Sequence, residues 1–103
     1  MTIDEFAAIT QRVIARDGFD EFMPTACYPE RRDIRTLAGL PADVEPEPAV
    51  LNWAMKHAKP NEEILIAFKS RPSEFTIVRK EGDERESQSF KVEVKRGRRR
   101  AKG

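Results

Sequence analysis

The sequence predicts an α+β domain in which two or three N-terminal helices pack on a three-stranded antiparallel β-meander, followed by a flexible basic tail. Apolar residues recur at helical spacing in the first half of the chain and with the period of two of a strand from residue 62 onwards. Helices followed by a run of strands are typical of an α+β fold. We therefore expect a single α+β domain over residues 1–94 and a basic tail over residues 95–103.

The first helix is predicted over residues 2–17. Thr2 and Glu5 have the spacing of a capping box, in which each side chain accepts a hydrogen bond from a backbone N–H at the start of a helix. Gly18 supplies a stop signal. The apolar residues that recur at helical intervals are Ile3, Phe6, Ile9, Val13 and Ile14.

Residues 19–39 predict a loop and a short helix. Residues 19–29 are rich in aromatic side chains but lack a clean period, and two prolines interrupt any long element. We expect an ordered loop that can hold a short extended piece. A second helix is predicted to begin just after Pro29 and to end near Gly39, because proline suits the first turn of a helix. Ile34 and Leu37 would face inwards in this helix, and Arg31, Arg32 and Arg35 outwards.

A stiff acidic connector and a third helix come next. Three prolines within residues 41–48 exclude a helix interior and favour extended backbone. The third helix is predicted over residues 49–58, ending before Pro60 because a residue that precedes proline is pushed out of helical geometry. The residues expected on its buried side are Val50, Leu51, Ala54, Met55 and Ala58.

Alternation with a period of two predicts three strands over residues 62–69, 73–80 and 88–95. The first is apolar on both faces, which is typical of a central strand. A two-residue turn at Gly82-Asp83 would join the second and third strands as a hairpin. That register sets Phe75 opposite Phe90 and Arg79 opposite Glu86, and both are favourable cross-strand pairs.

The sequence contains no strong signature of catalysis, of a metal site or of a bound cofactor. Cys27 and His57 are the only cysteine and the only histidine. They would need to lie within hydrogen-bond reach to act as a nucleophile and its base, and a lone cysteine is more often a small buried hydrophobic residue. A structural zinc site needs four such ligands. We therefore expect a protein that is not an enzyme and that binds no metal or cofactor.

Nothing in the sequence predicts insertion into a membrane or export. The longest uninterrupted apolar run, residues 64–68, is far shorter than the ~20 residues needed to span a bilayer. The first ten residues carry Asp4 and Glu5 where a signal peptide has basic residues. We expect a soluble, cytoplasmic protein.

Charge is divided unevenly along the chain. The tail holds 6 of the 19 Lys and Arg residues, so residues 1–94 keep 13 of them against 18 Asp and Glu. A mildly acidic body therefore ends in a strongly basic segment. Arginine side chains suit phosphate oxygens, so we expect a small non-catalytic binding protein that contacts nucleic acid or another polyanion through this tail. The expected contact residues are Lys95, Arg96, Arg98, Arg99, Arg100 and Lys102.

Three other interpretations compete with this one. The tail can be a solvated chain end without a partner, or it can bind an acidic protein surface. The main alternative is a protein–protein adaptor or regulator, including a homodimer, that uses the helical layer and an open sheet face. Its expected contact residues are Trp53, Leu65 and Val78, the last two because they would form an apolar patch if helices covered only the other face of the sheet.

Overall fold

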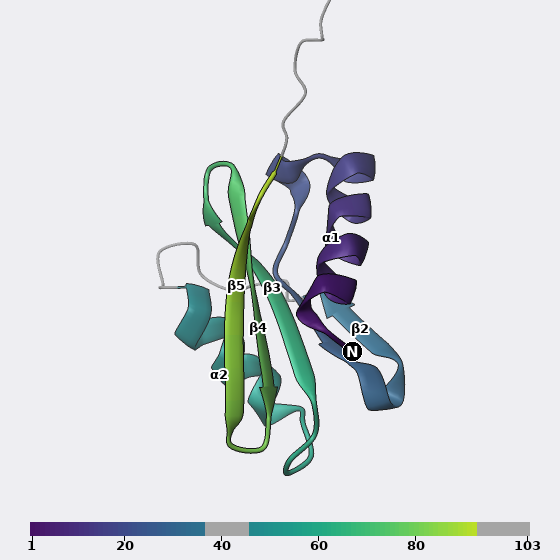
Figure 1. Ribbon diagram of the computed structural model, residues 1–103, viewed down its shortest axis with the longest axis vertical. Coiled ribbons are helices and arrows are strands. Elements are labelled where there is room, and N and C mark those ends of the chain that lie inside the picture. The colour runs from purple at the N-terminus through teal and green to yellow at the C-terminus, as the bar shows by residue number, and fades with distance from the viewer. Residues whose placement is uncertain (37–45, 93–103) are drawn as a thin grey trace, which may run out of the picture.

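The computed structural model of the protein describes residues 1–36 and 46–92, and shows a five-stranded antiparallel sheet with one helix on each face (Figure 1). The strands lie in the order β2-β1-β3-β4-β5. The elements in chain order are α1 (Ile3–Asp17), η1 (Phe19–Glu21), β1 (Thr25–Tyr28), η2 (Pro29–Arg31), β2 (Asp33–Thr36), α2 (Pro46–Lys56), β3 (Ile64–Arg71), β4 (Glu74–Glu81) and β5 (Glu84–Lys91).

This architecture keeps the α+β class but corrects the predicted arrangement. The predicted three-stranded meander is part of a five-stranded sheet, and α1 is the one long helix rather than the first of two or three similar ones. The two additional strands, β1 and β2, come from the region predicted as a loop and a second helix.

Helix α1 forms as the sequence predicts. The backbone N–H of Glu5 donates to Thr2 Oγ1 at 3.1 Å, and the N–H of Thr2 donates to Glu5 Oε1 at 2.8 Å, so the capping box is complete. The helix ends at Gly18, whose φ of +89° is readily adopted by glycine. One face of α1 is buried against β3, β4 and β5.

The predicted second helix is wrong, because the chain turns back on itself after Pro29 and forms the β1–β2 hairpin. Pro29 does start a helical turn, but it is the single 3₁₀ turn η2. Arg32 then takes a left-handed conformation with φ of +55°, which ends the turn and starts β2. Tyr28 pairs with Asp33 across this loop. Ile34, predicted to face inwards, is 52% exposed on β2, one of the two edge strands of the sheet.

Helix α2 begins three residues before the predicted helix. Pro46 and Pro48 both lie in its first turn, where a missing N–H breaks no helical hydrogen bond. The connector predicted over residues 41–48 therefore ends at Pro46, and its earlier part lies outside the described residues. Ala54 is fully buried against the sheet, whereas Met55, expected on the same buried side, is 45% exposed.

The β3–β4–β5 meander confirms the predicted hairpin. Glu81 pairs with Glu84 around the turn at Gly82, Phe75 pairs with Phe90, and their rings stack with centroids 5.3 Å apart. The third strand starts at Glu84 rather than Gln88, because an edge strand can pair through its backbone without burying side chains. The predicted end of this strand, residues 93–95, lies outside the described residues.

The sheet separates two apolar clusters. On the α1 side, side chains such as Phe6, Leu65 and Phe75 pack together. On the α2 side, Tyr28 and Ile66 pack with residues of α2. Residues Ile64 to Phe68 of β3 are therefore buried on both faces, as expected for a central strand.

Candidate functional site

The β4–β5 hairpin carries opposite charges on its two faces. Neighbouring residues along a strand point to opposite faces, and residues directly opposite on paired strands share a face. Phe75, Phe90 and Ile77 belong to the α1-side cluster, which fixes the orientation of the whole register. Lys80, paired with Arg85, therefore points to the α2 side, while Arg79, Glu81, Glu84 and Glu86 point to the α1 side.

We name the α2-side surface of this hairpin the cationic face, made by Lys80, Arg85 and Lys91 with the hydroxyl groups of Ser87 and Ser89. All of these side chains are exposed except that of Lys80, which is half-buried. Ser89 shares a hydrogen bond of 2.9 Å with Thr76. The carboxylate of β4 on this side belongs to Glu74, which is opposite Lys91 in the register and whose Oε1 lies 3.6 Å from Arg71 Nε. The cationic face therefore runs along β5 to Lys91, two residues before the undescribed end of the chain.

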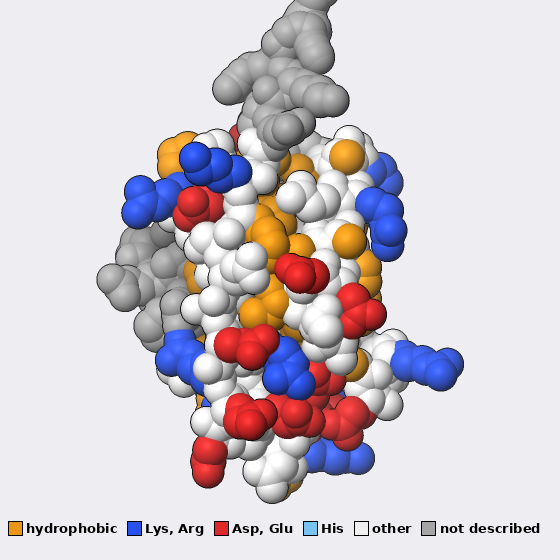
Figure 2. Space-filling model, in the orientation of Figure 1, with side chains coloured by type: hydrophobic (Ala, Val, Ile, Leu, Met, Phe, Trp, Pro, Cys, Tyr) orange, Lys and Arg blue, Asp and Glu red, His pale blue; other side chains and the backbone are white. Residues whose placement is uncertain are grey.

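The α1-side surface near the β4–β5 turn is acidic. Figure 2 shows acidic side chains gathered at the end of the molecule that holds this turn. The Arg79 guanidinium lies among them, 2.7 Å from Glu63 and 3.0 Å from Glu81. Glu63 also accepts a hydrogen bond from the N-terminal ammonium at 3.2 Å. These contacts fasten the start of α1 to the sheet, which gives them a structural role.

A second ion pair fixes the loop between α2 and β3. Arg31 holds the Glu62 carboxylate with two hydrogen bonds, of 2.7 and 2.8 Å, and also donates to the carbonyl of His57 at 2.6 Å. The backbone N–H of Lys59 adds a bond of 2.9 Å to Glu62. The bond from Arg31 and then the bond from Lys59 lower the pKa of the Glu62 carboxyl to about 2. Arg31 also stacks 4.4 Å from the Tyr28 ring, so the loop is tied to both η2 and β1.

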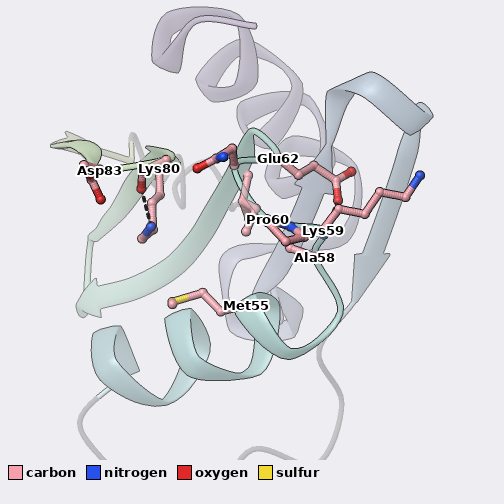
Figure 3. Close-up of a pocket in the computed structure, with 10 residues that line it drawn as sticks. Met55, Ala58, Lys59, Pro60, Glu62, Lys80 and Asp83 are labelled. Atoms are coloured by element: carbon pink, nitrogen blue, oxygen red, sulfur yellow. Dashed lines mark hydrogen bonds between the residues drawn. The ribbon is translucent and has the colours of Figure 1, made fainter.

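This loop forms one wall of a cavity of about 380 Å³ beside the cationic face (Figure 3). Met55 reaches into it from α2 and Lys80 from β4, whereas the Lys59 side chain points away. The Lys80 ammonium donates to the carbonyl of Gly82. The remaining lining residues include Ala58, Pro60, Asn61 and Ile64.

The polar end of the cavity is shaped by two residues with positive φ. Asn61 has φ of +64° and Gly82 has φ of +61°. A Cβ atom added to Gly82 would lie 3.2 Å from Asn61 Oδ1, so the side chain of Asn61 and the β4–β5 turn are in close contact. The cavity thus has an amide, a carbonyl and an ammonium at one end, apolar groups along its wall, and the carboxylates of Glu62 and Asp83 among its lining residues.

A shallower hollow of about 380 Å³ lies at the other end of the sheet, between η1 and the β3–β4 turn. The Lys69 ammonium lies beside it, donates to the carbonyl of Asp20 at 3.0 Å and lies 5.2 Å from the Phe19 ring centroid. Lys69 is on the α1 side of the sheet, since its partner in the register is Phe75. It therefore does not join the cationic face, whereas Lys91 does.

The residues predicted as sites from the sequence are placed as follows. The six tail cations, Lys95 to Lys102, lie outside the described residues. Trp53 is half-buried on α2, with its ring centroid 4.4 Å from that of His57. Leu65 and Val78 are both buried, Leu65 on the α1 side and Val78 on the α2 side. These two side chains therefore do not form the exposed apolar patch that the adaptor interpretation expected on the sheet.

Cys27 and His57 lie on opposite sides of the sheet. The Cys27 thiol is in the α1-side cluster, 4.0 Å from the sulfur of Met1, whereas His57 follows α2 and is exposed. Burial is the main reason that the pKa of the Cys27 thiol is raised. A thiol–imidazole pair is therefore not assembled. Among the residues with described positions, no three His, Cys, Asp or Glu side chains are grouped so that they could hold a metal ion.

The comparisons with known proteins add no assignment. The sequence matches no protein-family model, and we found no curated protein and no solved structure similar to the chain. Neither described helix is long and apolar enough to cross a bilayer.

The cationic face and the cavity were not singled out from the sequence, although part of the signal was there. The predicted hairpin register already placed Arg79 opposite Glu86, and one further step along each strand places Lys80 opposite Arg85 on the other face. The cavity had no such signal, because Met55 and Lys80 meet only once α2 is packed against β3.

Proposed function

We propose that this protein is a small non-catalytic binding protein that contacts nucleic acid or another polyanion along the cationic face and through its basic tail. The observation that carries the proposal is the placement of Lys80, Arg85 and Lys91 on one face of the hairpin. This face ends at the residue from which the chain continues toward six Lys and Arg without a carboxylate among the last nine residues. The two basic features are separated by only three residues of the sequence, Val92, Glu93 and Val94, so one extended polyanion can contact both.

The chemistry of the cationic face suits a chain of phosphates. Lys and Arg donate charge-assisted hydrogen bonds to phosphate oxygens, and serine hydroxyl groups add neutral donors. Residues on one face of a strand repeat every ~6.8 Å, so Ser87, Ser89 and Lys91 form a regular row of donors. Such a row contacts the phosphate backbone of a nucleic acid and does not contact the bases. We therefore expect sequence-independent binding, with a dissociation constant in the micromolar range or weaker at physiological salt.

The test is the salt dependence of binding to a labelled single-stranded oligonucleotide. Each phosphate contact on a single strand adds about −0.7 to the slope of log K against log salt, so the six tail cations contribute about −4. The full-length chain should show at least this slope. A variant in which all six tail cations are replaced by Gln should have a slope that is shallower by about 4. The proposal would be overturned if binding did not depend on the salt concentration, or if the tail variant bound the oligonucleotide with the same affinity and salt slope as the full-length chain.

The adaptor alternative has less support. With Leu65 and Val78 buried, the described sheet features open to a partner are its two edges, β2 and β5. Charged side chains on both faces of β5, Glu84 and Glu86 on one and Arg85 and Lys91 on the other, are typical of an edge that resists pairing with another strand.

A further inference from the structure

We propose that the cavity between Met55 and Lys80 binds one nucleotide, with the aromatic base against its apolar wall and the phosphate at the Lys80 ammonium. This inference rests on the proposed function and deepens it, because it names the chemical unit that the polyanion must contain. The cavity opens beside the cationic face, since Lys80 contributes to both. A strand whose backbone follows β5 would therefore pass the mouth of the cavity.

The size and lining of the cavity fit a ligand of this kind. Its volume of about 380 Å³ falls within the range of ~300–1,000 Å³ that is typical of small-molecule sites. Such sites combine apolar walls with a few polar groups, as Met55, Pro60 and Ile64 do here with Lys80 and Asn61. Ile64 is buried at 3% exposure and forms a fixed floor.

The exposed methionine favours an aromatic ligand. Met55 is 45% exposed, which is high for a large apolar side chain, and it points into the cavity (Figure 3). A thioether makes favourable contacts with aromatic rings and adapts its shape to a ligand. A nucleobase placed against Met55 and Pro60 would cover this apolar surface.

The polar end favours an anion and a hydrogen-bonding edge. Lys80 donates one hydrogen bond to Gly82, and an ammonium has three N–H groups, so two remain for a phosphate. The Asn61 amide has both a donor and an acceptor, which the edge of a base requires. Two carboxylates also line the cavity. Glu62 is held by Arg31, whereas Asp83 is exposed in the turn, so the phosphate must lie on the side of the Lys80 ammonium that faces away from Asp83.

The loop that carries Asn61 and Pro60 is held in place before any ligand arrives. Arg31 and Glu62 anchor it to η2, and the Tyr28 hydroxyl donates to the carbonyl of Ala54 at 3.2 Å, which anchors the end of α2. A site whose walls are already fixed loses less entropy when it binds a ligand.

The experiment is an NMR titration of the full-length protein with adenosine 5′-monophosphate, following the Met55 methyl group and the backbone amides of Asn61 and Gly82. We expect these signals to shift and to saturate. Adenosine alone and inorganic phosphate alone should each need about tenfold higher concentrations, because each makes only part of the contacts. Absent shifts, or shifts that phosphate reproduces at equal concentration, would overturn the inference.

Matched variants test the two halves of the site. Met55→Ser should weaken binding of the nucleotide about tenfold, whereas Met23→Ser, at a methionine that is 42% exposed elsewhere on the surface, should not. Lys80→Gln should weaken the nucleotide and leave adenosine unaffected, with Lys56→Gln on the exposed surface of α2 as its control. Equal effects of a variant and its control would contradict the assignment.

A single-stranded oligonucleotide in the same titration identifies the source of the nucleotide. Saturation of the Met55 and Asn61 signals at concentrations at least about tenfold below those of the free nucleotide assigns the site to a nucleic-acid strand. Tighter binding of the free nucleotide assigns it to a mononucleotide. Salt-dependent oligonucleotide binding without any response from these signals overturns the cavity assignment and leaves the proposed function standing. If neither the salt-dependent binding nor the response of these signals is observed, the proposed function and the cavity assignment are both overturned.

Discussion

At the scale of single residues, the structure depends on buried carboxylates that are hydrogen-bonded to partly exposed arginines. Glu62 has a side chain only 3% exposed, and it accepts hydrogen bonds from Arg31 and from the backbone of Lys59. The sequence could not identify this pair, because it joins residues 31 positions apart. Arg31 was predicted to face outwards from a helix, and it is the β1–β2 hairpin that brings it to Glu62.

Replacement of Glu62 by Gln should lower the free energy of unfolding by about 1–3 kcal/mol at neutral pH, since it removes the charge from a hydrogen-bonded buried group. The pKa of Glu62 is about 2 in the folded protein and 4.5 without its partners. Its charge therefore stabilises the fold fully above pH ~4.5, and this stabilisation is lost as the pH falls toward 2. Urea unfolding at several pH values should show the difference in the free energy of unfolding between the two proteins disappearing as the pH falls from about 4.5 to 2.

Glu84→Gln is the matched control, because Glu84 is exposed on β5. It should have little effect on unfolding at neutral pH. If the difference in the free energy of unfolding between Glu62→Gln and the native protein stayed constant down to pH 2, the charge of Glu62 would not be what stabilises the loop.

At the scale of elements, the sequence predicted those whose signals are local and missed those that depend on pairing. Helix α1 carries its own capping box and stop, and the β4–β5 hairpin carries its own turn and two matched pairs. The β1–β2 hairpin instead depends on β1 adding to the edge of β3, with Ala26 paired to Ile66. A proline that also suits a helix start made the helical interpretation of this segment equally consistent with the local sequence.

Arg32→Gly separates the observed hairpin from the predicted helix. Arg32 has φ of +55°, where a residue with a Cβ is strained by ~1 kcal/mol, so glycine would relieve strain while increasing the entropy of the unfolded chain by a similar amount. We expect a change in the free energy of unfolding within about 0.5 kcal/mol. In a helix interior the same change would cost about 1 kcal/mol.

Arg35→Gly provides the comparison within the same hairpin. Arg35 lies in β2, where glycine gains nothing and should cost about 0.5–1 kcal/mol. If urea unfolding showed the same decrease in the free energy of unfolding for Arg32→Gly and Arg35→Gly, the result would contradict the left-handed turn at Arg32.

At the scale of the whole molecule, the two helices decide which surfaces remain for binding. They cover both faces of β3, so apolar residues that the sequence placed on an open sheet face are buried. The surface that the outer hairpin leaves exposed is polar, and its charged side chains are separated into an acidic face and the cationic face. The sequence predicted the basic tail and the register of the hairpin. It could not show that the cations of the hairpin share one surface, because that depends on which face each helix covers.

The most direct test of this account compares two double variants that remove the same charge from different places. Arg85→Gln with Lys91→Gln neutralises the cationic face, and Arg12→Gln with Lys56→Gln removes two exposed cations from α1 and α2. Binding to a labelled single strand is measured over a series of salt concentrations. We predict that the first variant has a log–log salt slope shallower by about 1.4 and that the second matches the native protein. Equal slopes for the two variants would contradict the account.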